Sequence, residues 1–106
     1  MIARRLHPVI DGPHRYDIVA FAYHVDAIDP LQSSIDMTLQ RGLDIVRLRF
    51  LGPRQLAIEP GFPVATRGMV FYDRSDDGLK DIGVEVADFE GSHGSITFFA
   101  AAVIRL

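Results

Sequence analysis

The sequence predicts an all-β fold, a single-domain antiparallel β-sandwich or barrel of about seven strands with at most one short helix. Three observations lead to this prediction. The chain has 106 residues, the length of one ordinary domain. Apolar and polar residues alternate with a period of two along most of it, as in half-buried strands. Turn residues, mainly Gly and Pro, recur about every 8 to 12 positions, a spacing typical of sandwiches and barrels.

The expected elements follow in chain order. Residues 1–106 form one β domain, and residues 1–14 are its N-terminal arm or loop, because Pro8, Gly12 and Pro13 interrupt any alternation. The expected strands are residues 16–25, 34–40, 44–51, 54–59, 68–73, 82–90 and 95–106. The glycines of residues 91–94 predict a hairpin turn before the last strand.

Two of these strands are apolar on both faces. In 16–25 the rows are Val19, Phe21, Tyr23 and Val25 on one face and Ile18, Ala20, Ala22 and His24 on the other. The strand 95–106 is predicted to be central, because both of its faces are apolar. Only one face of a strand meets the core of a two-layer domain, so a helix, the arm or a second subunit must cover the other. This argument predicts a homodimer.

Residues 30–41 allow two interpretations. Asp29 and Pro30 suit the N-cap and first position of a helix, with Leu31, Ile35 and Leu39 at helical spacing. The complete alternation of residues 34–40 favours a strand. We expect the strand.

Composition bounds the location and the partners. The chain has no cysteine, which excludes a disulfide scaffold, thiol catalysis and Cys-based zinc sites and fits a reducing, cytoplasmic location. We expect no signal peptide, because no apolar run follows the first basic residues, and the longest apolar run is far shorter than the ~20 residues of a membrane-spanning helix. The net charge of −3 provides no basic footprint. We therefore expect neither nucleic acid nor a membrane as partner.

The acidic residues concentrate in one region, which is the candidate partner-binding site. Seven acids lie there, namely Asp73, Asp76, Asp77, Asp81, Glu85, Asp88 and Glu90. Only Arg74 and Lys80 oppose them, so the region has a net charge of −5. Such a stretch is either a solvated loop and outward strand face or a surface that attracts a basic protein partner.

No histidine predicts catalysis or metal binding. His7, His14, His24 and His93 lack metal-ligand spacing, and each is expected to be a hydrogen-bonded structural residue. Ser92 precedes His93 on a turn, where adjacent side chains seldom face each other, so a hydrolase is not expected. We expect no catalytic residue, metal or organic cofactor.

One loop has a partial likeness to a calcium loop. Asp73, Ser75 and Asp77 match the first three side-chain ligand positions. The twelfth position, where a bidentate glutamate is needed, holds Val84, and Glu85 lies one step late. We expect a glycine-containing turn between strands instead.

Alternatives remain at three further places in the sequence. Arg47 and Arg49 face outward and either bind an anion or pair with Glu85 or other acids across the sheet. Phe62 either contacts a partner or folds back over the sheet edge. Asp88 and Glu90 continue a row of inward valines, so either the strand leaves the core there or a bulge turns them outward and lets Phe89 enter; a buried, paired Asp88 would be the functional version.

Three segments carry a resemblance. They are residues 46–56 (VRLRFLGPRQL), 86–90 (VADFE) and 96–98 (ITF). An apolar strand ending in Phe-x-Gly, a short turn to Leu and a closing hairpin with acids at its tip resemble small bacterial all-β proteins of uncharacterised or toxin-immunity type. The resemblance implies an all-β fold and neutralisation of a partner protein by binding, and it carries no catalytic residue over.

Three hypotheses of function follow. The first is a non-catalytic binding or inhibitory module, with an immunity-like role as one form of it, that acts through a protein surface at residues 73–90. The alternative is a small-ligand- or metal-binding β-barrel with a partly empty interior, lined by Phe21, Phe50, Phe71 and Phe98. The third is a structural subunit that exists only as an oligomer.

Overall fold

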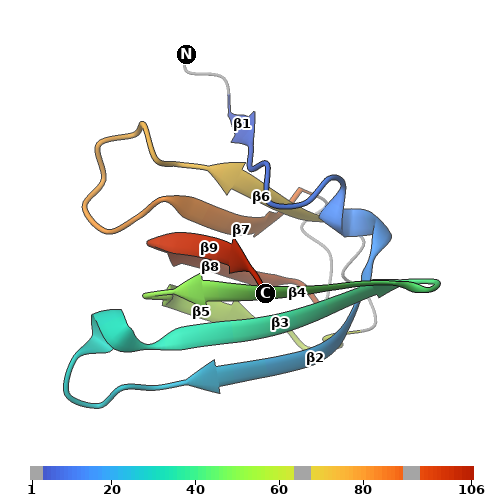
Figure 1. Ribbon diagram of the computed structural model, residues 1–106, viewed down its shortest axis with the longest axis horizontal. Coiled ribbons are helices and arrows are strands. Elements are labelled where there is room, and N and C mark those ends of the chain that lie inside the picture. Colours follow the sequence, from blue (N-terminus) through green and yellow to red (C-terminus); the bar gives the residue numbers. More distant parts are fainter. Residues whose placement is uncertain (1–3, 64–67, 90–93) are drawn as a thin grey trace.

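Nine strands in two antiparallel sheets make up the regular structure of this computed structural model, which describes residues 4–63, 68–89 and 94–106 (Figure 1). One sheet has the strand order β1-β6-β7-β8-β5 and the other β2-β3-β4-β9. The strands are β1 (Arg5–Leu6), β2 (Asp17–His24), β3 (Ser34–Arg41), β4 (Asp44–Leu51), β5 (Arg54–Ile58), β6 (Met69–Asp73), β7 (Val84–Asp88), β8 (Ile96–Ala100) and β9 (Ala102–Arg105). The all-β prediction is confirmed, with nine strands instead of seven, and the two sheets do not close into one cylinder.

Helical structure is limited to two single turns in the described residues, the 3-10 turns η1 (Pro13–Arg15) and η2 (Pro30–Gln32). Asp29 does act as a cap, because its carboxylate accepts the backbone N–H of Leu31 at 3.1 Å. The helix stops after that turn, and Ser34–Arg41 forms β3 as expected. No helix in the described ranges is long and apolar enough to cross a bilayer.

The core lies between the two sheets and is filled by side chains. Phe50 of β4 packs edge-to-face on Phe71 of β6 and on Phe98 of β8, with ring centroids 5.5 and 4.9 Å apart. All three phenylalanines are at most 1% exposed. Burying one such side chain contributes about 1.5–3 kcal/mol to the free energy of folding. Three of the four phenylalanines expected to line an empty interior therefore pack against one another, and the fourth, Phe21, lies half-buried at the sheet edge.

The prediction of one long strand at 95–106 is wrong, because the chain changes sheets at Ala101 and forms two shorter strands. β8 lies in the five-stranded sheet and β9 in the four-stranded sheet. The backbone N–H of Ala101 donates to Leu51 O at 2.8 Å, and that of Gly83 donates to Ala100 O at 2.9 Å. The apolar run is continuous because it serves two sheets in turn. It therefore needs no second subunit to cover a whole face, and the homodimer loses that argument.

The two predicted rows of β2 are also corrected. A bulge at Val19 interrupts the pairing with β3, since Ile18 pairs with Leu39 and Ala20 with Thr38. One extra residue shifts the alternation by one position. Phe21 and Tyr23 follow the bulge and pair with Met37 and Ile35, which are buried. Phe21 and Tyr23 therefore share the inner face with Ile18, and Ala20, Ala22 and His24 lie on the outer face.

The strand expected at 82–90 is shorter than predicted. β7 pairs regularly with β6 from Val84 to Asp88, where Asp88 lies opposite Met69. Phe89 follows the strand and is 58% exposed. The chain leaves the strand only after Asp88, and Phe89 does not enter the core. Asp88 keeps the inward register of Val84 and Val86, is half-buried and has one carboxylate oxygen shielded from solvent, so the alternative of a buried Asp88 is found in part. Glu90 and the predicted hairpin turn, including His93, lie outside the described residues.

Candidate functional site

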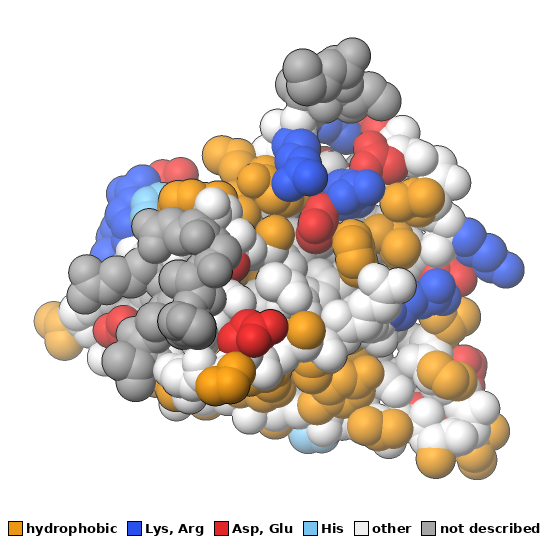
Figure 2. All heavy atoms as spheres, turned by 180° about the vertical axis from the view of Figure 1, so that it is seen from behind, with side chains coloured by type: hydrophobic (Ala, Val, Ile, Leu, Met, Phe, Trp, Pro, Cys, Tyr) orange, Lys and Arg blue, Asp and Glu red, His pale blue; other side chains and the backbone are white. Residues whose placement is uncertain are grey.

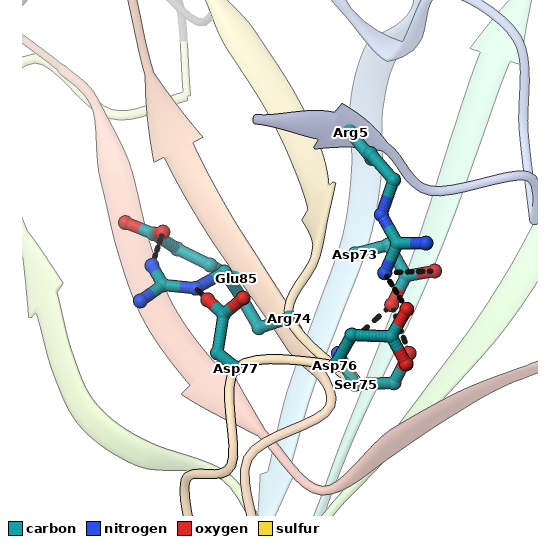
Figure 3. A network of polar contacts seen from close by, with 7 residues as sticks. All are labelled: Arg5, Asp73, Arg74, Ser75, Asp76, Asp77 and Glu85. Carbon is teal, nitrogen blue, oxygen red and sulfur yellow. Dashed lines mark hydrogen bonds and ion pairs between the residues drawn. The ribbon is translucent and has the colours of Figure 1, made fainter. Parts of the chain in front are cut away.

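Five of the predicted site acids lie at the connection between β6 and β7, and Figure 3 shows four of them with their arginine partners. They are Asp73, Asp76, Asp77, Asp81 and Glu85. We call these five acids and the segment that joins them the acidic loop. Asp88 lies at the opposite end of β7, four residues beyond Val84 and therefore about 13 Å along the strand. The predicted set is thus not a single patch.

Arg74 is enclosed by two of these acids. Its Nη1 donates to Glu85 Oε1 at 2.5 Å, and its Nε donates to the carboxylate of Asp77. The guanidinium also lies 6.0 Å from the centroid of the Phe99 ring, which it covers on the outer face of the sheet. The hydrogen bond that Arg74 donates to Asp77, followed by the one that it donates to Glu85, raises the pKa of Arg74. Arg74 therefore attaches the loop to β7 and β8.

Two arginines from distant parts of the chain neutralise the rest of the loop. Arg5 of β1 lies 2.8 Å from Asp76 and 3.8 Å from Asp73. Arg54 of β5 lies 3.3 Å from Asp81. Hydrogen bonds from the Ser75 hydroxyl and backbone N–H hold the pKa of Asp73 below its usual value.

The arginines that pair with these acids lower the negative charge with which the region could attract a basic partner. The five acids of the acidic loop carry a charge of −3 when only Arg74 and Lys80 of the same segment are counted with them, and Arg5 and Arg54 reduce this to −1. Figure 2 shows acidic and basic side chains interleaved on this face. The carboxylates face arginines, and no group of three or more His, Asp or Glu in the described chain could hold a metal ion.

The first strand of the four-stranded sheet differs from the others. Of the eight residues of β2 only Ile18 is buried, whereas buried and half-buried residues alternate along β3. Val19 is 52% and Tyr23 37% exposed, and Ala20 and Ala22 are exposed as well. Among the described residues β2 pairs with β3 alone, so its outer edge is unpaired (Figure 1).

The other three sheet edges are short or irregular. β1 has two residues and β9 has four. β5 has five residues, and a bulge between Arg54 and Ala57 interrupts its pairing where Gln55 has a φ of 56°. Short strands, bulges and edge charges all discourage the addition of another strand. β2 is eight residues long, contains no Lys, Arg or Pro, and has only the bulge at Val19.

An apolar loop continues the exposed surface beyond the end of β2. Val25 is 73% and Ile28 96% exposed. The carboxylate of Asp26 accepts the backbone N–H groups of Ile28 and Asp29, both at 2.9 Å, which lowers the pKa of Asp26. The buried Ser33 accepts the Asp26 N–H at 2.9 Å. The loop is thus fixed by hydrogen bonds while its apolar side chains face solvent.

The outer face of β3 and β4 is occupied by an ion pair. Arg49 donates to both carboxylate oxygens of Asp36 at 2.7 and 3.0 Å, a bidentate pair. Its hydrogen bond lowers the pKa of Asp36. Arg49 therefore pairs across the sheet as expected, with Asp36 instead of Glu85. His24 lies 3.8 Å from Asp36 and is 63% exposed.

Phe62 follows the second of its two alternatives. It is half-buried, packs against the core and meets Phe21 of β2 edge-on, with ring centroids 6.0 Å apart. The segment after β5 thus covers part of the inner face of β2 next to the unpaired edge.

A surface pocket of about 560 Å³ lies between the N-terminal arm and β6. Its lining includes Leu6, His7, Ile10, Val70, Tyr72 and Phe89. His7 Nδ1 accepts the Val9 N–H at 3.1 Å, so the neutral ring carries its proton on Nε2. Burial lowers the pKa of His7. Sequence reasoning missed this pocket because its walls come from three separate segments.

Known proteins add no further constraint on this site. No family model, curated protein or solved structure matches the chain. The resemblance to small immunity-type proteins therefore stays a prediction.

Proposed function

We propose that this chain is a non-catalytic protein-binding module that takes its partner by strand addition at the outer edge of β2. The observation that carries the proposal is the long outer edge of β2, which no other described strand pairs with and which has exposed apolar residues on both faces. An extended segment of a partner would pair with the free backbone N–H and C=O groups of this edge. An inhibitory, immunity-like role would be one form of this function.

The acidic loop is the weaker candidate for the same role. A basic partner would have to displace Arg5 from Asp76 or Arg54 from Asp81 before it gained an ion pair of its own. Exposed ion pairs contribute only about 0–1 kcal/mol each, so exchanging one pair for another gives little net affinity. Burial of the exposed apolar residues of β2 is not offset in this way.

Affinity capture from the native host with three matched baits tests the proposal. In Ala20→Lys/Ala22→Lys two lysines lie on the outer face of β2. In the control Thr38→Lys/Gln40→Lys they lie on the outer face of the neighbouring β3. In Asp76→Asn/Asp81→Asn the acidic loop loses two carboxylates.

We expect the β2 variant to lose the partner that the wild type retains and the other two baits to keep it. Loss of the partner from the acidic-loop variant, with retention by the β2 variant, would contradict the proposal and restore the acidic loop as the binding surface.

Small-ligand binding is a second candidate, supported by the pocket beside the arm. The pocket lies outside the core, so the ligand would not occupy the interior of the fold. Apolar walls, the Nε2–H of His7 and the guanidinium of Arg15 suit a small aromatic carboxylate. Ligand-observed NMR with benzoate tests this: binding should weaken in Phe89→Ala, and no binding at millimolar benzoate would remove the candidate.

A further inference from the structure

We infer that the strand added to β2 is β2 of a second copy of this chain, antiparallel about a two-fold axis at Ala22. This inference rests on the function proposed above and names its partner. Two four-stranded sheets would then join into one continuous sheet of eight strands. The argument depends on the regularity of β2, on the faces of its side chains and on its charges.

The regular part of β2 fixes the position of the axis. After the bulge at Val19, the residues from Ala20 to His24 pair one to one with β3, without a shift in register. A bulge-free segment can accept another strand with the ordinary antiparallel hydrogen-bond pattern. The centre of this five-residue segment is Ala22, and a two-fold axis there lets each copy use the whole segment.

Pairs across this axis lie on matching faces. Phe21 of one copy would lie opposite Tyr23 of the other on the inner face, and this aromatic pair occurs twice. On the outer face Ala22 would meet its own copy, and Ala20 would lie opposite His24. Aromatic cross-strand pairs stabilise a sheet, and the small alanines allow close approach.

The charges permit self-pairing. Between Ala20 and His24 the only titratable groups are the Tyr23 hydroxyl and the His24 imidazole, and no acidic or basic side chain would lie opposite one of its own sign. Asp17 lies outside the regular segment. A basic partner finds no carboxylate in the segment to select it, whereas a second copy matches it face by face.

The exposed valines on either side of the axis would become more buried in this arrangement. Val19 and Val25 lie three positions before and after Ala22, so Val25 of one copy approaches Val19 of the other. They are 52% and 73% exposed in the single chain. A second copy would thus bury apolar surface at both ends of the segment. Interfaces of one short strand pair are small, so we expect a dissociation constant in the micromolar range or weaker.

Single cysteines test the register, because the natural chain has none. Cα atoms of directly opposite residues are about 4.5–5.5 Å apart in an antiparallel pair, within the range of about 4.4–6.8 Å that a disulfide spans. Ala22→Cys should therefore form a symmetric disulfide under mild oxidation. Ala20→Cys alone should not, since the two copies of position 20 would be about 14 Å apart, but mixed with His24→Cys it should give a heterodimer.

Thr38→Cys, on the outer face of β3, is the control for random collision. Equal cross-linking at positions 22 and 38 would overturn the inference, as would a monomeric mass of the wild type at several hundred micromolar. A monomeric protein whose β2 variant still loses a host partner would leave the proposed function standing and remove only the self-pairing. Loss of neither partner nor dimer in Ala20→Lys/Ala22→Lys would remove both.

Discussion

In the structure the acids of the acidic loop are paired and β2 is largely exposed, whereas the sequence predicts that the acidic loop is the binding surface and that β2 is buried. The loop has the highest density of like charge in the chain, yet Arg5, Arg54 and Arg74 pair with its acids. β2 has the pattern of a buried strand, yet seven of its eight residues are not buried. Acids that are already paired with arginines of the same chain contribute little binding free energy to a partner. Exposed apolar residues contribute more, because a partner removes them from water.

The largest effect is expected where the acidic loop rejoins the sheet. A Cβ on Gly83 would lie 2.3 Å from Ala101 O, so Gly83→Ala must displace the backbone where the chain changes sheets. We expect a loss of about 2–3 kcal/mol in the free energy of unfolding. Chemical denaturation measures it.

Gly78→Ala is the matched control, since a Cβ there meets nothing within 4 Å and only the positive φ of 70° is strained. It should cost about 1 kcal/mol. A loss as large as that of Gly83→Ala would mean that close packing at Ala101 is not the cause.

Arg74→Ala should have the next largest effect. It leaves the half-buried Asp77 and Glu85 without their partner and uncovers Phe99. We expect a loss of about 1–2 kcal/mol in the free energy of unfolding, against less than about 0.5 kcal/mol for Lys80→Ala in the same loop. Equal stability of the two variants would contradict an attaching role for Arg74.

How far the sequence could predict these regions depends on the range of the interactions. β3 and β4 were predictable because alternation is local, and each inward residue from Ile35 to Phe50 obeys it. The bulge at Val19 was not, since one extra residue reverses the faces without changing composition. The sheet change at Ala101 was hidden because the apolar pattern runs through it.

The prediction of the acidic region as the binding site is weakened for a related reason. Charge counted along residues 73–90 omits Arg5 and Arg54, which approach the loop only after folding. A signal for the β2 edge was present: two alanines, apolar residues on both faces and no lysine or arginine between Asp17 and His24. The same pattern also predicts a buried central strand, because the sequence does not say which strand lies at an edge.

Removing acids from the loop should have a smaller effect. Asp76→Asn/Asp81→Asn disrupts the pairs with Arg5 and Arg54, which involve partly exposed side chains. Each pair should contribute less than about 1 kcal/mol to the free energy of unfolding. Melting at low and high salt should differ less in this variant than in the wild type, and an increased salt dependence would mean that the acids repel each other more than the arginines attract them.

The smallest effect should be the pH dependence of the arm that brings Arg5 to the loop. Burial holds the pKa of His7 below its usual 6.5, so the unfolded chain binds a proton more readily than the folded one. The free energy of unfolding should fall as pH drops from 6.5 towards the lower folded pKa. His7→Asn should flatten this part of the profile in chemical denaturation between pH 7 and 5; an unchanged slope would assign it to another group.

Sedimentation equilibrium from 10 to several hundred micromolar distinguishes β2 from the acidic loop as the binding surface. Three proteins are compared: the wild type, Ala20→Lys/Ala22→Lys and Asp76→Asn/Asp81→Asn. We predict reversible dimers for the wild type and the acidic-loop variant. The β2 variant should form a dimer at least tenfold weaker, since the two lysines at position 22 would lie directly opposite each other. If the acidic-loop variant weakened the dimer and the β2 variant left it unchanged, the acidic loop and not β2 would be the binding surface.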